Sequence, residues 1–483
     1  MNDRPAPAPS ARSGTAATPR RRGGRLVAVL LATAVLLPSP AAPAIDAAEV
    51  AAAEPLVTLA PATGVDPTAA ASPKAAPAAS PKTTITADLP ASITISRYGT
   101  RTKAKLKVTA TGKKLRYTWQ VSKPGSRHWK KVKKGTSATL TVTTKWRAGT
   151  KFRVVVTGTK GKAVSRTTTL KVLQPSLTPA ADAQAKFGLT GLRQGVDLSA
   201  YQAGASIPTI AAWAGNGGVM LLRTASGARP VRTDYVSLCT GAKGNTGRVP
   251  VVEDCAYRGF AKAARAKRLR IGHYWFNGWI DSTDPTANQV FANGYTVVDS
   301  ARDFVAWLIA DGGYTKTSTD PLVLDIENGR AWTSKSGGKK YTASLRAWNP
   351  QEATAFLQTV RQLLTGQGYQ ANLYVYMSAN AASRRAADGS YVWAPLAGSV
   401  RLWVASWGTD NGRVPDKLPA TGPWQTWSIW QYSSNLRIPG SRAGALDADL
   451  VRPHAWTPLE LPQPSTGPGG WLTTEVGLGR GIG

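Results

Sequence analysis

The sequence predicts an α/β protein in which a (β/α) barrel follows a small all-β sandwich. Short apolar runs alternate with helical patterns between residues 193 and 456, which is the length and rhythm of such a barrel. Before them, residues 91–173 alternate apolar and polar side chains in short segments separated by Gly- and Lys-rich turns, as strands of a sandwich do. Apolar residues make up 42% of the chain, enough to bury both cores.

The N-terminal segment predicts export. Several arginines precede an apolar run at residues 26–37, and Ala42-Pro43-Ala44 follows as a small-residue cleavage site. This is the layout of a secretory signal peptide, and the run is too short to span a bilayer, which takes about 20 residues. We therefore expect residues 1–44 to be a signal peptide and the mature protein to be secreted, without a membrane span.

Composition divides the rest of the chain. Residues 45–90 are mostly Ala, Pro, Thr and Ser, and they carry too little bulky apolar content to offset the entropy of ordering. We expect a linker there and a second linker at residues 174–192. Residues 457–483 return to Pro and Gly and are expected to form a tail.

The all-β interpretation of residues 91–173 depends on alternating apolar positions. Ala104, Leu106 and Val108 mark one such segment, and residues 115–121 mark another. Further strands are expected near residues 140–142, 152–156 and 170–172. The strand pattern resembles that of bacterial immunoglobulin-like modules, without their cysteine pair.

The same segment is strongly basic. It holds 22 Lys and Arg residues and no Asp or Glu, in a chain whose net charge is +33. A solvated surface is the ordinary explanation of a charge run, but solubility does not require the exclusion of every acid, and mutual repulsion costs stability. Because an exported protein meets surface polymers rather than chromosomes, we expect residues 91–173 to bind anionic cell-wall polymers, with no nucleic-acid partner.

The cysteine and histidine counts exclude a structural zinc domain. Two cysteines and three histidines do not supply four ligands at the usual spacing. Outside the cell Cys239 and Cys255 are free to form a disulfide, and two buried free thiols are the alternative. We expect no metal and no cofactor.

Apolar runs mark the candidate barrel strands, at residues 219–222, 271–276, 322–326, 373–376 and 402–405. One helix is clear between two of them. Asn349 is suited to cap it, Pro350 suits its first turn, and apolar positions recur at helical spacing until Gly366.

Asp325 and Glu327 are the candidate catalytic pair. They end the run Leu322-Val-Leu-Asp-Ile-Glu327, and residues two apart on a strand point to the same face. Asn328-Gly329 then ends the strand, which places the pair at the carboxyl end, the catalytic face of barrels. Proximity is expected to raise the pKa of one carboxyl while its neighbour stays ionised, as glycosidase catalysis requires.

Further acids and aromatic side chains stand at other strand ends. Asp197 ends the first barrel strand and Asp447 lies on the last one, followed by Asp449. Because sugar rings present apolar C–H faces, aromatic side chains beside a few acids suit a carbohydrate polymer. The candidate substrate-binding residues are Tyr201, Tyr274, Phe276, Tyr376, Trp403, Trp407, Trp430 and Tyr432.

These segments, in this order, resemble the lysozyme-like N-acetylmuramidases of glycoside hydrolase family 25. The resemblance covers about residues 191–453 and is carried by Gly195-Val-Asp, Asp325-Ile-Glu and Trp430-Gln-Tyr, with residues 272–276, 402–407 and 446–449. It implies a modified β/α barrel that cuts the β-1,4 bond between N-acetylmuramic acid and N-acetylglucosamine in peptidoglycan.

The resemblance also implies roles for the acids. Glu327 matches the general acid, Asp325 its partner on the same strand, and Asp197 the first-strand acid. Asp447 matches the Asp of a closing Asp-x-Asn motif, in which Asp449 replaces the Asn. The family's Ala-Tyr-His-Phe reads His273-Tyr-Trp-Phe276 in this sequence.

Several alternatives stay open. Asp325 either attacks the sugar directly or orients the substrate's 2-acetamido group, which then attacks. A catalytically inactive wall-binding protein anchored by the basic domain is the competing interpretation, although such a protein has no use for clustered acids. A chitinase would need further acids at Leu322 and Val323, and a peptidase built on Cys255 and His273 is less favoured.

Overall fold

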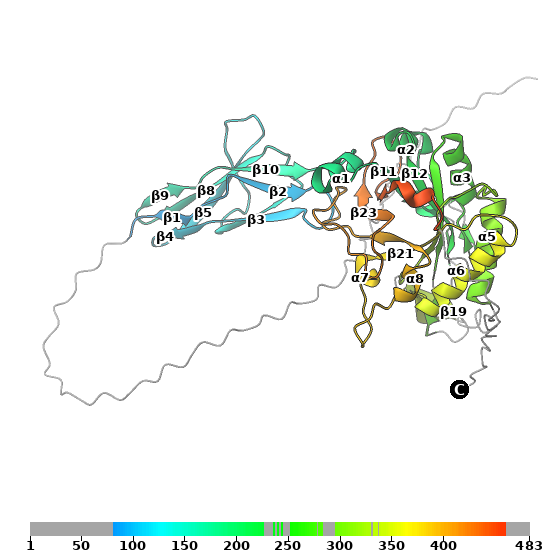
Figure 1. The fold of residues 1–483 in the computed structure, drawn as a ribbon. Coiled ribbons are helices and arrows are strands. Elements are labelled where there is room, and N and C mark those ends of the chain that lie inside the picture. The colour runs from blue at the N-terminus through cyan, green and yellow to red at the C-terminus, as the bar shows by residue number, and fades with distance from the viewer. Residues whose placement is uncertain are drawn as a thin grey trace, which may run out of the picture. The chain divides into compact units, whose positions relative to one another are not determined.

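The computed structural model (Figure 1) describes residues 81–226, 235–236, 239–240, 243–244, 252–277, 279–283, 295–329, 332–336 and 338–459. The predicted signal peptide, residues 45–80 of the predicted linker and residues 460–483 of the predicted tail lie outside the described residues. None of the helices within these ranges has both the length and the apolar character needed to cross a membrane.

The regular elements between residues 84 and 173 are all strands. One sheet has the order β2-β10-β8-β5-β6 with β9 beside β8, while β1 pairs with β4 and β3 pairs with β7. This all-β character agrees with the sequence, and the arrangement as a sandwich stays a prediction. The strands are β1 (Thr84–Ala87), β2 (Ser92–Ser96), β3 (Lys103–Lys107), β4 (Thr109–Thr111), β5 (Arg116–Ser122), β6 (Lys130–Lys131), β7 (Thr139–Thr143), β8 (Lys151–Gly158), β9 (Gly161–Val164) and β10 (Thr168–Leu173).

Ordered structure extends into both predicted linkers. Strand β1 lies before residue 91, and the Asp88 carboxylate after it accepts hydrogen bonds from the backbone N–H groups of Leu89 and Arg166. Helix α1 (Pro179–Phe187) lies in the second linker and buries Ala183. Both elements are short and poor in bulky apolar residues, so composition alone does not distinguish them from linker.

Trp119 lies in the core of the β region. Its side chain is fully buried, and its indole N–H donates to the Ser137 carbonyl at 2.9 Å. On β8, Phe152, Val154 and Val156 are buried and alternate with more exposed residues, as the period of a strand requires. The predicted apolar positions therefore do form the inner face.

The cations of this region face solvent. All 22 lysines and arginines between residues 91 and 173 are exposed except Arg153, which is half-buried. Arg153 lies over the Trp129 ring, 4.2 Å from its centroid, and donates to Gln120 Oε1 at 2.7 Å. Among the ion pairs between described residues, none includes a residue of 91–173. Within the described residues, this basic surface therefore forms no ion pair with an acid of the chain.

The second region alternates strands and helices. Its main elements are β11 (Arg193–Leu198), α2 (Ile207–Ala214), β12 (Val219–Ser226), α3 (Tyr257–Ala266), β16 (Arg270–Phe276), α5 (Val297–Ala310), β18 (Leu322–Asp325), α6 (Pro350–Thr365), β21 (Leu373–Ser378), β22 (Arg401–Ala405), β23 (Ile429–Leu436) and β24 (Leu446–Val451). The shorter elements are η1 (Ala200–Gln202), β13 (Tyr235–Val236), β14 (Lys243–Gly244), β15 (Val252–Glu253), β17 (Trp279–Ser282), β19 (Trp332–Ser336), β20 (Lys339–Arg346), α7 (Ala379–Ala382), α8 (Ala394–Ala397) and η2 (Pro453–Trp456).

Eight of these strands close on themselves. The order is β11-β24-β23-β22-β21-β18-β16-β12, and β12 pairs with β11 again. All neighbours are parallel except β24, which runs antiparallel to both β11 and β23. The five predicted apolar runs lie in β12, β16, β18, β21 and β22, so the mixed α/β class of this region is confirmed.

The closed sheet separates two apolar layers. Met220, Leu222 and Leu324 pack in one cluster with side chains of α2, α3, α5 and α6. Val219, Leu221, Val323, Tyr374 and their inward neighbours form another cluster that contains no residue of those helices. Because successive strand residues point to opposite faces, every second residue of each strand points inside the ring. This alternation places the candidate site.

Helix α6 begins as predicted. The Asn349 side chain accepts a hydrogen bond from Glu352 N–H, and the Glu352 carboxylate accepts one from Asn349 N–H. This capping box satisfies two backbone donors at the helix start. The helix buries Phe356 and Val360 on its inner face.

We predict that Trp119→Ala destabilises the β region by about 3–5 kcal/mol, because it leaves a large cavity in the core. Denaturant unfolding of the full chain measures the midpoint of that region's transition. Thr141→Ala, at an exposed position on β7, is the control and is expected to stay within about 0.5 kcal/mol of wild type. Equal midpoints for all three proteins would contradict the described core.

Candidate active site

The acids meet inside the ring, at the carboxyl ends of its parallel strands. Asp197 on β11 pairs in register with Asp447 on β24, so their side chains project side by side. Asp325 is the last residue of β18 and follows Val323 of the inner layer by two positions. Asp449, two residues beyond Asp447, also points inside. The structure therefore brings together the predicted acids Asp197, Asp325 and Asp447.

Gln431 on β23 connects this cluster to the aromatic side chains. Its Nε2 donates to Asp197 Oδ2 at 2.8 Å. Its Oε1 accepts from the Tyr376 hydroxyl at 3.0 Å and from the Trp407 indole at 2.9 Å. With both ends of its amide in use, Gln431 fixes the orientation of the Asp197 carboxyl.

Asp325 is buried among like charges. Its side chain is 5% exposed, and its Oδ1 has no hydrogen-bond partner among the described residues. Burial raises the pKa of Asp325 well above its usual range, and the nearby carboxylates Glu327 and Asp197 raise it further, while Arg223 opposes them. A buried acceptor without a partner is available to a donor on a bound substrate.

Glu327 follows β18 by two residues, with its side chain open to solvent. The surrounding protein removes part of its hydration and raises the pKa of Glu327 to about 7, with Arg223 opposing the shift. Asn277 holds the backbone here: its Nδ2 donates to the Glu327 carbonyl at 3.0 Å, and its Oδ1 accepts from Trp348 N–H at 2.7 Å. A carboxyl with this pKa is available as a proton donor near neutrality.

The remaining acids are also shifted upward. Burial, followed by the charge of Asp449, raises the pKa of Asp197. Burial also raises the pKa of Asp447, where Asp197 and Asp410 add to the effect. Asp449 is fully buried, which together with Asp447 raises its pKa, while its Oδ1 accepts from the Trp403 indole at 2.9 Å. The cluster therefore holds protons that isolated carboxyls would release.

Three predicted aromatic residues form the floor beneath the acids. Tyr274, Tyr376 and Trp403 belong to the inner layer. The Trp403 ring centroid lies 5.8 Å from that of Tyr274 and 4.6 Å from that of Tyr376, in edge-to-face contacts. All three are at most 7% exposed, so they shape the base of the site.

Three others are open to solvent. Tyr201, in the η1 turn after Asp197, is 70% exposed. Phe276 at the end of β16 and Trp407 after β22 are each partly exposed. These side chains are accessible to a large ligand.

Trp430 and Tyr432 are not brought to the acids. Both are fully buried in the layer between the sheet and the helices. The Trp430 ring packs against Phe187 of α1, and its indole N–H donates to the Ser406 carbonyl. They flank Gln431, and alternation points them away from the interior, so we do not retain them as substrate contacts.

The imidazole of His273 also lies outside the site. It is fully buried, and its Nδ1 is 2.8 Å from the Tyr257 hydroxyl of α3. Its other nitrogen lies 3.4 Å from Asp320 Oδ2. Within the described residues, no group of three or more His, Cys, Asp or Glu side chains is arranged to hold a metal ion.

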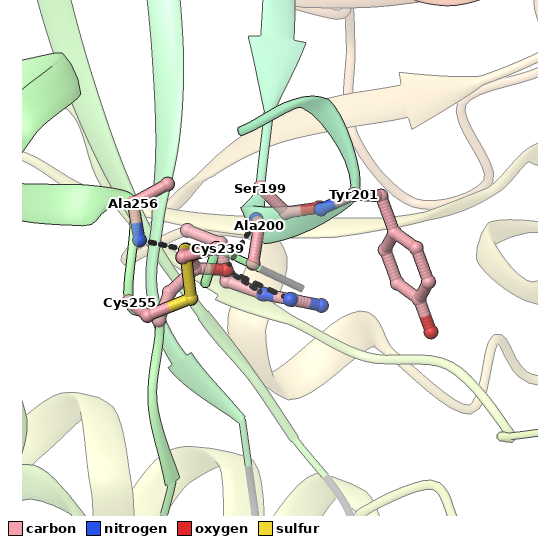
Figure 2. The surroundings of a disulfide bond; sticks show 8 residues. Ser199, Ala200, Tyr201, Cys239, Cys255 and Ala256 are labelled. Atoms are coloured by element: carbon pink, nitrogen blue, oxygen red, sulfur yellow. Dashed lines mark hydrogen bonds and ion pairs between the residues drawn. A yellow bond between two sulfur atoms is a disulfide. The ribbon is translucent and has the colours of Figure 1, made fainter. Parts of the chain in front are cut away.

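Cys239 and Cys255 form a disulfide, which excludes the alternative of two free thiols (Figure 2). The disulfide lies near the turn after β11, and Figure 2 shows the Tyr201 ring pointing away from it. Asp254, next to Cys255, accepts a hydrogen bond from Ala200 N–H at 2.8 Å. The disulfide therefore fixes a loop beside the mouth of the site.

Sequence reasoning missed several residues of the site. Gln431 lies in the motif Trp430-Gln-Tyr432, of which the sequence prediction names only the aromatic residues as substrate contacts. Strand alternation places Gln431 on the opposite face from its two neighbours. Arg223 follows Leu221 by two positions on one strand, and this spacing predicts that both side chains point to the same face. Asn277 and Asp254 act through contacts distant in sequence, and no local pattern indicates them.

We predict that Asp449→Asn stabilises the fold at neutral pH. An acid whose pKa is raised in the folded state contributes stability below its unfolded pKa and loses it as pH rises through the folded pKa. Asparagine stays neutral and still accepts from Trp403. Its advantage in free energy of unfolding is therefore expected to grow from acidic to neutral pH, as denaturant titrations at several pH values will show.

Asp388→Asn is the matched control. Asp388 is exposed, and hydrogen bonds from Ser390 lower its pKa, so its substitution has the opposite sign or no effect. A constant advantage of Asp449→Asn at all pH values would contradict the raised pKa of Asp449.

One family of known proteins matches part of the chain. Residues 249–441, which include Asp325 and Glu327, match glycosyl hydrolases family 25. No curated protein matches the chain.

Similar solved structures include the spore cortex lytic enzyme SleM of Clostridium perfringens, with 16% identity over 54% of this chain and 67% of that chain and a TM-score of 0.32. A muramidase from Trichobolus zukalii has 15% identity over 54% of this chain and 93% of that chain, with a TM-score of 0.30. The PKD domain of human KIAA0319 has 17% identity over 22% of this chain and 96% of that chain, with a TM-score of 0.16. By the match at residues 249–441, this part of the chain is similar to glycosyl hydrolases family 25, which supports a glycoside hydrolase of the lysozyme type.

Proposed function

We propose that this protein is a secreted N-acetylmuramidase that hydrolyses the β-1,4 bond between N-acetylmuramic acid and N-acetylglucosamine in peptidoglycan. The observation that carries the proposal is the pair Asp325 and Glu327, at the carboxyl end of one barrel strand within the region matched to the family. Burial and mutual repulsion make such a pair share a proton near neutrality.

In the proposed reaction Glu327 is the general acid and base. It gives its proton to the glycosidic oxygen as positive charge develops on the sugar ring, and the bond to the leaving sugar breaks. It then takes a proton from the water that completes hydrolysis. Its open side chain and pKa of about 7 suit both steps.

Asp325 is the partner carboxylate. Its buried Oδ1, which has no partner among the described residues, would accept the N–H of the substrate's 2-acetamido group while the acetamide oxygen attacks the anomeric carbon. Direct attack by Asp325 is the alternative, and both routes retain configuration. We favour the assisted route because an oriented N–H donor would satisfy the orphaned acceptor.

The other acids and the aromatic residues would support the reacting sugar. Asp197 and Asp447 line the same interior, and the buried aromatic floor excludes water from beneath it. Tyr201, Phe276 and Trp407 are accessible for stacking against sugar faces.

We also propose that the basic surface of residues 91–173 holds the enzyme on anionic cell-wall polymers. Lys103, Lys105 and Lys107 are all exposed on one face of β3, with Thr141 of β7 opposite Lys105. Phosphate polymers suit such exposed and unpaired cations. A catalytically inactive wall-binding protein remains the alternative to the enzyme.

We predict that Glu327→Gln lowers peptidoglycan hydrolysis by about 10²–10⁴-fold, because the amide has no proton to transfer. Release of reducing ends from purified peptidoglycan measures the rate, and mass analysis identifies N-acetylmuramic acid at the new reducing end. Asp416→Asn, at a side chain that is 94% exposed, is the control and is expected to leave the rate unchanged. Equal release by wild type and Glu327→Gln, with both proteins pelleting with walls, would favour the binding protein.

We predict that changing Lys103, Lys105 and Lys107 together to Gln weakens binding to purified walls several-fold at about 0.05 M salt and much less at about 0.5 M salt. Exposed charges act through solution and are screened over about 8 Å at physiological salt. The triple change to Arg keeps the charge and is expected to bind like wild type. An equal loss for Gln at both salt concentrations would point to shape recognition instead.

A further inference from the structure

Arg223 is a buried cation inside the barrel. It lies on β12 two positions beyond Leu221 of the inner layer, and it pairs in register with Tyr274, which also points inside. Only 9% of the residue is exposed. A bulge follows between Arg223 and Ala225, and Ala225 returns to the outer layer. The strand therefore aims this guanidinium toward the carboxyl end of the ring, where the acids lie.

Burying an arginine is costly, and the fold pairs it with Asp254. Arg223 Nε lies 2.8 Å and Nη2 lies 2.7 Å from Asp254 Oδ2, and the Asp254 side chain is 1% exposed. A well-packed apolar pair of similar size is often as stable as a buried ion pair. The pair is thus not required for packing, which points to a role for its charge.

Asp254 is held in place on every side. Its carboxylate accepts from Ala200 N–H at 2.8 Å and from Ala256 N–H at 3.0 Å. Its own N–H donates to the Thr224 carbonyl, and Cys255 joins the disulfide (Figure 2). A carboxylate fixed in this way fixes the guanidinium that it binds.

The groups that face this guanidinium across the ring are nearly all acidic. They are Tyr201 from η1, whose ring centroid lies 5.7 Å from the guanidinium carbon, Asp197 from β11, Tyr274 from β16, Asp325 from β18 and Glu327 after it, Tyr376 from β21, and Asp447 and Asp449 from β24. The inward residues Trp403 of β22 and Gln431 of β23 do not titrate. Within the described part of the ring, Arg223 is the one cation among these groups.

We propose that Arg223 is a positioning residue that prevents Asp325 and Glu327 from both holding a proton near neutrality, and that Asp254 limits the positive charge presented to the two acids. This inference rests on the proposed function of the acid pair. Arg223 acts from its place in the barrel wall, without contact to the reacting atoms. Its attraction lowers the pKa of both Asp325 and Glu327 and so opposes the effect of burial. Asp254 neutralises part of that attraction.

The test follows the pH profile of kcat/KM for peptidoglycan hydrolysis. The double variant Arg223→Met with Asp254→Asn removes the cation without leaving an unpaired buried acid. The dependence of kcat/KM on pH is expected to be bell-shaped, with an acidic and a basic limb. We expect both limbs to move to higher pH, by about one unit, because the pKa values of Asp325 and Glu327 rise together. The single variant Asp254→Asn leaves the guanidinium unopposed, and both limbs are expected to move to lower pH.

Arg223→Lys is the conservative control. It keeps a cation beside Asp254, so its limbs are expected to stay near those of wild type even where kcat/KM falls. A purely structural role for the pair would lower kcat/KM at every pH with the limbs unmoved in all variants, and that result would overturn the proposal. Shifts of the two variants in the same direction would overturn it as well.

A second readout does not need turnover. The free energy of unfolding of the full chain is measured against pH for wild type and the double variant. Raised carboxyl pKa values cost stability as pH rises, so the double variant is expected to lose stability more steeply between acidic and neutral pH. Parallel curves would overturn the role of Arg223. If wild type released no reducing ends, the proposed function would fail while this comparison still tested the inference.

Discussion

The crowding of five carboxyl side chains inside one end of the barrel is the constraint on which the site depends. Moving even one carboxylate out of water costs several kcal/mol, and neighbouring negative charges add to that cost. The cluster therefore carries fewer charges than carboxyls near neutrality, which is the condition for a proton donor beside an ionised partner. Its members are Asp197, Asp325, Glu327, Asp447 and Asp449.

The surrounding scaffold offsets this cost one carboxyl at a time. Gln431 donates to Asp197, and Trp403 donates to Asp449. Arg223, on β12 and separated from β18 by β16, attracts Asp325 and Glu327. Asp325 Oδ1 and Asp449 Oδ2 are left without a hydrogen-bond partner among the described residues. Gln431, whose amide oxygen and nitrogen are both hydrogen-bonded, leaves the Asp197 carboxyl little freedom to reorient. Transition-state stabilisation requires such preorganisation.

Strand alternation explains how much of this site the sequence reveals. The two-residue period of strands and the positions of the strand ends predict that Asp197, Asp325 and Asp447 lie together. Asn349 predicts the start of α6. The same period separates Gln431 from its flanking aromatic residues, but aromatic character outweighed it in the prediction. The sequence does not predict Asp254 as part of the site, because its partner Arg223 lies 31 residues away and antiparallel pairing of β15 with β12 brings the two together. The β region begins before residue 91 because backbone pairing with β4, rather than apolar content, holds β1.

A chain with a net charge of +33 holds this cluster of acids without neutralising it, and electrostatic range explains why. The charges that shift the pKa values of the five carboxyls come from one another, from Arg223 and from Asp410, and none comes from residues 91–173. Exposed lysines act through salt solution and fade over about 8 Å, whereas Arg223 acts through protein of low dielectric constant. The proposed attachment to an anionic wall and the proposed tuning of the acid pair thus depend on separate cations. Salt is expected to weaken the first while leaving the second in place.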